Sequence, residues 1–174
     1  GKTDKIIGGS CTYAAYSASY FYKPIQPIAV IGGDFDQVEI AAMKARGIEF
    51  DGIEVKENEK SFFWSGKYHM DMNTRDTLVT DLNVLETFDP KVPASCQDCD
   101  FLMLGNLMPV LQQKVIHQFT TRPKFIIMDT MNFWMDIAMP DLLETIKMVD
   151  LILVNDAEAR QLSNEYSLVK AAKK

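Results

Sequence analysis

The sequence predicts an α/β fold with a mainly parallel sheet and a small antiparallel β-sheet lid. Short apolar runs, such as residues 151–154, alternate with segments of helical spacing, which is typical of parallel strands joined by right-handed crossovers. Residues 50–85 instead alternate at every second position and keep polar side chains on one face, which is typical of a one-sided antiparallel sheet. We therefore predict an α/β body of residues 1–49 and 86–174, with a lid of residues 50–85.

The composition of the chain is that of a globular protein and argues against several classes of partner. Of the 174 residues, 47% are hydrophobic and 24% are charged, so the chain can bury a sizeable core. The net charge of -6 argues against a nucleic-acid or anionic-membrane partner, because such partners need clustered Lys and Arg. Since no apolar run has the length of a bilayer and no signal peptide is visible, we expect a cytoplasmic protein.

The three cysteines are interpreted as incidental thiols. Cys11, Cys96 and Cys99 have no disulfide-framework spacing, which fits a reducing compartment. A zinc site at the Cys96–Cys99 pair would need two more ligands, and the two histidines have no matching spacing.

Two glycine pairs mark the first part of the chain. Gly8 and Gly9 open a predicted helix of small side chains over residues 10–21, where they permit close approach of a neighbouring element or of a ligand at the helix N-terminus. A buried strand over residues 27–31 ends at the second pair, and a helix is predicted over residues 35–46.

Three lid strands are predicted over residues 53–56, 61–69 and 77–85. On the second of them one face is aromatic and could stack on a base or sugar ring, pack the lid onto the body, or meet a dimer partner. That face consists of Phe62, Trp64, Gly66 and Tyr68.

Two polar residues of the lid are candidates for chemistry. Arg75, between two lid strands, could reach over a bound anion or form a salt bridge with Asp71 or Asp76. His69 is an acid or base by type, but the sequence shows no partner for it.

The second half of the chain returns to the α/β rhythm. Strands are predicted over residues 101–104, 124–128 and 151–154, and helices over residues 109–119 and 139–148, with Phe133 and Trp134 in a loop.

Asn155 and Glu158 follow the last apolar strand and open a predicted helix. Open α/β sheets bind ligands at the carboxyl ends of their strands, and an amide and a carboxylate on one helical turn can hold a hydrated Mg²⁺ with its phosphates. The alternative is a helix N-cap with a favourable acid in the first turn.

Taken in order, these segments resemble the PfkB family of ribokinase-like kinases along nearly the whole chain. The segments that carry the resemblance are Gly8-Gly9, Gly32-Gly33-Asp34-Phe35, the alternating lid strands, Asp129-Thr-Met-Asn132 and Asn155-Asp-Ala-Glu158.

The resemblance implies an ATP-dependent phosphotransferase that acts on a hydroxyl of a sugar or nucleoside, with ATP and Mg²⁺ as cofactors. It implies an α/β/α sandwich with the lid over the substrate. Asn155 and Glu158 would hold Mg²⁺ and the triphosphate. The acceptor side and the cleft would contain Gly8, Gly9, Ser10, Gly33, Asp34, Arg75, Asn106 and Asp129.

The chain also departs from the family pattern. Tyr13 stands where ribokinase has a sugar-binding asparagine, which argues against ribose in that pose and leaves nucleosides and other sugars open. The sequence has neither the Gly-Ala-Gly-Asp stretch that supplies the anion hole and the catalytic base nor the early strand with a substrate-binding aspartate. We therefore expect a portion of a kinase that does not turn over substrate alone.

Two other functions and one assembly are considered. One function is a non-catalytic sugar- or nucleoside-binding protein on the same scaffold. The other is a Rossmann dinucleotide-binding domain. Two observations argue against it: no Gly-x-Gly-x-x-Gly follows a first strand, and that architecture does not include a lid. A homodimer could form through the lid strands.

Overall fold

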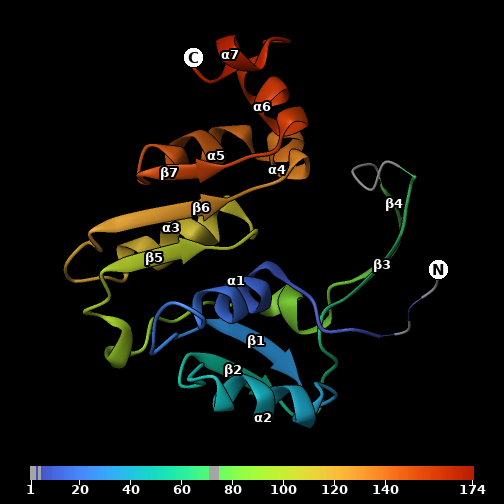
Figure 1. Cartoon of the computed structure of the whole chain (residues 1–174), viewed down its shortest axis with the longest axis vertical. Helices are drawn as coiled ribbons and strands as arrows, with labels where there is room; N and C mark the ends of the chain where they lie inside the picture. Colours follow the sequence, from blue (N-terminus) through green and yellow to red (C-terminus); the bar gives the residue numbers. More distant parts are fainter. Residues whose placement is uncertain (1–2, 4, 71–74) are drawn as a thin grey trace. The chain divides into compact units, whose positions relative to one another are not determined.

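The computed structural model describes residue 3, residues 5–70 and residues 75–174 (Figure 1). The chain folds as two compact units, Gly1–Asp89 and Pro90–Lys174. Within the described residues, no helix combines the length and the apolar character needed to cross a bilayer.

The first unit contains a parallel pair of strands with two helices, followed by an antiparallel hairpin. Its small core joins Ala15, Met43 and Ile48, each at most 4% exposed, from the two helices and the segment after them. The elements are α1 (Ser10–Ala18), β1 (Ala29–Gly32), α2 (Gln37–Ala45), β2 (Ile53–Lys56), β3 (Phe63–Tyr68), β4 (Arg75–Asp81) and the 3-10 helix η1 (Asn83–Thr87).

Local sequence signals explain the limits of α2. The Asp36 side chain accepts a hydrogen bond of 2.8 Å from the backbone N–H of Val38, which is a typical N-cap. Beyond the last turn, Gly47 has φ 80°, the left-handed conformation in which helices commonly end.

The assignment of residues 53–56 to the antiparallel lid is wrong. β2 pairs parallel with β1, with Ala29 opposite Ile53, so the chain forms a β1–α2–β2 crossover unit. The alternation of Ile53 and Val55 with charged residues correctly indicated a strand with one polar face. It could not reveal the partner's direction, because both kinds of pairing place alternate side chains on opposite faces.

The lid observed here is the two-stranded antiparallel hairpin of β3 and β4, which has a bulge between Ser65 and Gly66. The predicted aromatic face is present, because a Cβ at Gly66 would overlap the ring of Trp64, and that ring meets Tyr68 edge-on at 6.3 Å. All residues of β4 are exposed.

The third lid strand is shorter than predicted. β4 ends at Asp81, and η1 follows with Asn83 at φ 47°. Val84 turns inward and is fully buried, and η1 packs on β1. Burial of this side chain therefore ends the alternating pattern before residue 85. The wider division into a body of residues 1–49 and 86–174 and a lid of residues 50–85 stays a prediction.

The second unit is a parallel three-stranded sheet with helices between the strands, as predicted. The strand order is β5-β6-β7, with Leu104 opposite Met128 and Met128 opposite Ile152. The elements are η2 (Ala94–Cys96), β5 (Phe101–Leu104), α3 (Pro109–His117), β6 (Phe125–Asp129), α4 (Asn132–Ile137), α5 (Met139–Ile146), β7 (Leu151–Leu153), α6 (Asp156–Ser163) and α7 (Leu168–Ala171).

One face of this sheet builds the core of the second unit, with α3 and α5 behind the strands in Figure 1. The buried side chains are Leu104, Val115, Ile126, Met128, Met135 and Leu142. On the opposite face Leu151 and Leu153 are 41% and 45% exposed, so the expectation of a fully buried strand at residues 151–154 is right for one face only.

The expectation that Phe133 and Trp134 lie in a loop is wrong, because both belong to α4. This helix has six residues, fewer than two turns, so it contains too little sequence for a helical period to be recognised.

Candidate functional site

The second unit brings four predicted site residues to one edge of its sheet. Because β5, β6 and β7 are parallel, their carboxyl ends lie at the same edge. Asn106 follows β5, Asp129 is the last residue of β6, and Asn155 and Glu158 begin α6 directly after β7. Ligands of open α/β sheets bind at such an edge.

Asn155 and Glu158 form a capping box. The Asn155 side chain accepts from the backbone N–H of Glu158 at 2.9 Å, and Glu158 Oε2 accepts from the backbone N–H of Asn155 at 2.9 Å. Glu158 is only 7% exposed. The structural alternative raised by the sequence is therefore realised, and both side chains contribute to the start of α6.

This capping role is compatible with binding of a metal ion that takes only a few of its ligands from the protein. A carboxylate has two oxygens and several acceptor sites, and the box uses one oxygen of Glu158. Within the described residues, no three His, Cys, Asp or Glu side chains gather closely enough to hold a metal ion. The donor set thus fits a hydrated Mg²⁺ that takes one carboxylate and the phosphates of a nucleotide, and does not fit an all-protein cage.

Asp129 is the half-buried carboxyl group of this edge. Burial raises the pKa of its side chain, and a hydrogen bond from the Thr130 backbone N–H opposes that rise. A carboxyl group with a raised pKa at the end of a strand is a candidate for proton transfer or ligand binding.

Asn106 is held by α4, which the sequence did not reveal. The Trp134 indole N–H donates to Asn106 Oδ1 at 2.8 Å, and Asn106 Nδ2 donates to Met131 Sδ at 3.1 Å. Phe133 packs edge-on against Trp134 with ring centroids 5.0 Å apart. Trp134 therefore holds the predicted site residue Asn106 in addition to its contact with Phe133.

A second pair of bonds joins α4 to α6. Asn132 Nδ2 donates to Gln161 Oε1 at 2.6 Å, and Gln161 Nε2 donates to Asp136 Oδ1 at 2.7 Å. The two helices that flank the edge are thus joined through one glutamine. The four-residue spacing of Asn132 and Asp136 was the available signal, since it places both on one face of a helix.

In the first unit, Gly8 and Gly9 precede α1, whose first residue is Ser10. Gly9 has φ 94°, and a Cβ there would meet no atom of the described residues within 4 Å. A Cβ at Gly8 would have the Tyr13 hydroxyl as its nearest neighbour, at 4.0 Å. Gly9 is therefore required by backbone conformation and not by close packing, and space remains beside both glycines.

Gly33 and Asp34 are in the opposite situation. A Cβ at Gly33 would overlap the carbonyl oxygen of Glu57, and Asp34 Oδ1 accepts from the Ser61 backbone N–H at 2.6 Å. This hydrogen bond is the main reason why the pKa of Asp34 lies below its usual range. Both residues thus hold the turn that leads into β3, and their contact with a substrate stays a prediction.

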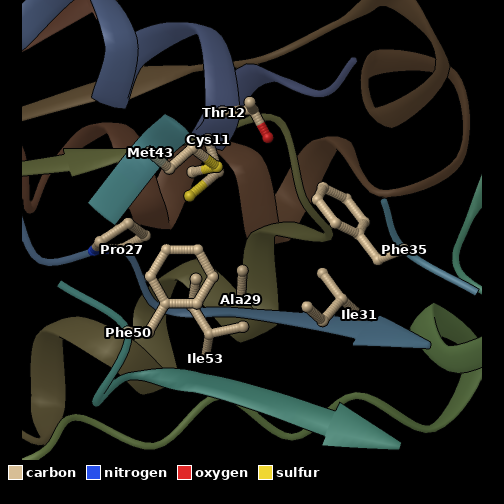
Figure 2. A pocket seen from close by; sticks show the side chains of 9 residues that line it. All are labelled: Cys11, Thr12, Pro27, Ala29, Ile31, Phe35, Met43, Phe50 and Ile53. Atoms are coloured by element: carbon tan, nitrogen blue, oxygen red, sulfur yellow. The ribbon is translucent and has the colours of Figure 1, made fainter. Parts of the chain in front are cut away.

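Figure 2 shows an apolar recess in the first unit. Cys11 and Thr12, just after Ser10, and Phe35, just after Asp34, are among its lining residues. The volume of the recess is about 30 Å³, which is too small for a sugar or a base ring.

Arg75 is the first residue of β4, opposite Tyr68, and is exposed. Asp76, one considered partner, lies with Oδ2 3.0 Å from Nε2 of His69, which supplies the histidine partner that the sequence did not show. The other considered partner, Asp71, lies outside the described residues.

Comparisons with known proteins identify the fold. No protein-family model matches the sequence, and no curated protein matches it. Among solved structures, the nucleoside kinase of Burkholderia thailandensis in complex with inosine is similar, with a TM-score of 0.70 and 16% identity, over 95% of this chain and 56% of that chain.

Two further solved structures are similar over most of the chain. The nucleoside kinase of Methanocaldococcus jannaschii, an archaeal member of the ribokinase family, has a TM-score of 0.71 and 15% identity over 95% of this chain and 55% of that chain. The PfkB protein of Polaromonas sp. JS666 has a TM-score of 0.66 and 16% identity over 96% of this chain and 61% of that chain.

The chain therefore has the PfkB, or ribokinase-like, fold, with parallel sheets, intervening helices and a small antiparallel sheet. It spans only 55–61% of the length of these three solved structures.

Proposed function

We propose that this chain is part of an ATP-dependent phosphotransferase that acts on a hydroxyl of a sugar or nucleoside. The observation that carries the proposal is the gathering of Asn106, Asp129, Asn155 and Glu158 at the carboxyl edge of one sheet, in a fold whose solved neighbours are kinases. Phosphoryl transfer depends chiefly on positioning and on charge neutralisation, which is what such an edge can supply.

In this proposal the second unit serves the nucleotide. The Glu158 carboxylate, supported by Asn155, would hold a hydrated Mg²⁺, which when bound would offset the charge of the phosphates. Asn106 and Asp129 line the same edge and offer an amide and a carboxyl group for hydrogen bonds. ATP and Mg²⁺ are accordingly the proposed cofactors.

The first unit serves the acceptor in the same proposal. Gly8 and Gly9 leave space at the start of α1, which begins with Ser10, and Gly33 and Asp34 are the other acceptor-side residues of this proposal. Arg75, on the exposed lid, can reach an anionic group of a bound ligand. A small-molecule sugar or nucleoside is the proposed partner.

We also propose that these 174 residues alone do not turn over substrate. The sequence contains no Gly-Ala-Gly-Asp stretch, so neither the anion hole nor the base that this motif supplies is present in it. The test is an ATP-coupled assay of the purified chain with a panel of sugars and nucleosides. We expect no turnover above background, and steady turnover at the rate of a typical kinase would overturn this part of the proposal.

Ligand binding by the same chain tests the broader proposal. A thermal-shift screen of nucleosides and sugars should reveal stabilisation that follows the ligand concentration. A second candidate function, a sugar- or nucleoside-binding protein without chemistry, is favoured by the structural role that Asn155 and Glu158 have in the capping box. Stabilisation by a nucleoside or sugar with no effect of Mg²⁺ and ATP would support this binding protein and contradict the kinase.

We further propose a homodimer through the lid. Both strands of a two-stranded hairpin need a covered face for stability, yet Tyr68, Leu78 and Val79 are 49%, 64% and 41% exposed. Sedimentation of the chain should show dimers that Leu78→Glu dissociates. Monomers at all concentrations would contradict the proposal.

A further inference from the structure

Gln112 joins the carboxyl ends of two neighbouring strands through one side chain. It lies on α3, is 2% exposed, and is fixed by two hydrogen bonds of its amide group. Its Nε2 donates to the carbonyl oxygen of Gly105 at 2.9 Å and to that of Asp129 at 3.0 Å. Both protons of the amide nitrogen are thereby used.

The two carbonyl groups lie where the pairing of β5 with β6 ends. The last paired residues of these strands are Leu104 and Met128, and Gly105 and Asp129 are the next residues along the chain. Beyond this last pair, the Gln112 amide bridges the carbonyl groups of Gly105 and Asp129. The side chain therefore continues the connection of β5 with β6 by one more step.

Of the two carbonyl groups that Gln112 bridges, one belongs to a predicted site residue and the other to the neighbour of a predicted site residue. Gly105 immediately precedes Asn106, and Asp129 is itself at the edge. We propose that Gln112 is a positioning residue that fixes the spacing of Asn106 and Asp129. The use of this spacing for ligand binding rests on the proposed function, whereas the spacing itself does not.

The burial of Gln112 supports a role for its donor end. Its Oε1 is buried and has no hydrogen-bond partner among the described residues, and the same holds for Thr130 Oγ1 in the residue after Asp129. An unpaired buried acceptor destabilises the fold, and an apolar side chain of similar shape would remove it. The two hydrogen bonds that Nε2 donates to the strand ends offset the destabilisation caused by the unpaired Oε1.

Gln113 offers a matched control on the same helix. Its Nε2 also donates two hydrogen bonds, to the Asp141 carbonyl oxygen at 2.9 Å and to Thr145 Oγ1 at 3.0 Å. Both acceptors lie on α5 and not at the strand ends. Gln112→Met and Gln113→Met each remove two donated bonds of nearly equal length, so loss of stability alone does not distinguish the two positions.

Trp134 is a built-in reporter of the position of Asn106, because its indole N–H donates to Asn106 Oδ1 at 2.8 Å. The chain has two tryptophans, so Trp64→Phe leaves Trp134 as the only tryptophan, whose emission is excited selectively over that of the tyrosines. In this background we expect Gln112→Met to move the emission to longer wavelength and to increase quenching by iodide. Gln113→Met should leave both unchanged. Urea unfolding monitored by circular dichroism identifies variants that are folded.

Two results would show that Gln112 does not position Asn106. Unchanged emission in folded Gln112→Met, or equal changes in both variants, would overturn the inference. If Gln112→Met does not fold, Gln112→Asn is judged by the same criterion, because its shorter side chain cannot span both carbonyl groups.

A nucleotide titration separates this inference from the proposed function. If Mg²⁺ and ATP bind, Gln112→Met should weaken the Kd by about tenfold while Gln113→Met leaves it unchanged, because misplacement of binding groups reduces affinity. An unchanged Kd in Gln112→Met would overturn the link to binding. If no variant binds nucleotide but the emission shift is present, the proposed function fails and the positioning role stands.

Discussion

Asn155 and Glu158 each accept the backbone N–H of the other, at 2.9 Å in both directions. The same two residues are the predicted Mg²⁺ and phosphate ligands, so their structural and functional roles must be separated by substitution. Glu158→Gln serves this purpose, because glutamine can occupy the third helical position of a capping box while losing the charge.

We predict that Glu158→Gln leaves the free energy of unfolding nearly unchanged but weakens Mg²⁺-dependent nucleotide binding. Asn155→Ala removes the capping acceptor and should lower the free energy of unfolding by about 0.5–2 kcal/mol. Asn155→Ser, which can still cap, is its control. Urea unfolding of the three variants measures the effects, and a loss of stability in Glu158→Gln as large as that in Asn155→Ala would contradict the separation.

The environment of Asp34 predicts that the stability of the first unit depends on pH. Its folded pKa is lowered, chiefly by the Ser61 backbone N–H, so its stabilising contribution is present above the unfolded pKa and is lost as the pH falls through the folded pKa. Asp34→Asn should remove this part of the acid sensitivity. The measurement is urea unfolding at neutral pH and below the usual range of aspartate.

Ser61→Ala is the control for that prediction. It removes the hydroxyl that accepts from the Gly32 backbone N–H at 2.9 Å but keeps the backbone N–H that binds Asp34. This variant should be less stable at both pH values and retain most of the pH dependence. Equal acid sensitivity in wild type and Asp34→Asn would show that Asp34 does not contribute.

The aromatic face of the lid predicts that substitution of Gly66 disturbs the hairpin. A Cβ at Gly66 would overlap the Trp64 ring and lie 3.0 Å from the Asp76 carbonyl oxygen. Gly66→Ala should displace the indole, change the near-ultraviolet circular dichroism, and destabilise the hairpin by about 1–3 kcal/mol. Gly8→Ala is the control, because its Cβ would have no neighbour closer than 4.0 Å. An unchanged aromatic spectrum in Gly66→Ala would contradict the packing of Trp64 on Gly66.

Two adjacent leucines of α5 should contribute very differently to the stability of the second unit. Leu142 is fully buried and Leu143 is 44% exposed. Leu142→Ala should lower the free energy of unfolding by about 2–5 kcal/mol, since it leaves a cavity in the core. Leu143→Ala should change it by about 0.5 kcal/mol or less. Similar effects at both positions in chemical denaturation would contradict this arrangement of the core.

The sequence was most informative where local signals determine the element. The strand predicted over residues 101–104 and the helix predicted over residues 35–46 correspond closely to β5 and α2. The pairing direction of β2 was mispredicted, because alternation indicates a covered face and not the partner strand. Helix α4 was missed, because six residues contain too little periodicity.

The candidate site was predictable in part for the same reason. Polar residues after apolar strands indicated Asn106, Asp129 and Asn155, since parallel strands share their carboxyl edge. Trp134 and Gln112 were not found as positioning residues, because their hydrogen bonds join segments that are distant in the sequence. Such contacts exist only after the strands and helices pack.

The central claim is that Mg²⁺ and ATP bind at the carboxyl edge of β5, β6 and β7. The most direct measurement is nuclear magnetic resonance of the isotopically labelled chain during addition of ATP with a small amount of Mn²⁺ in place of Mg²⁺. The account predicts early broadening of the amide signals of Asn155 and Glu158, followed by those of Asn106 and Asp129, and loss of this effect in Glu158→Gln. Broadening confined to other surfaces, or the same broadening in Glu158→Gln, would contradict it.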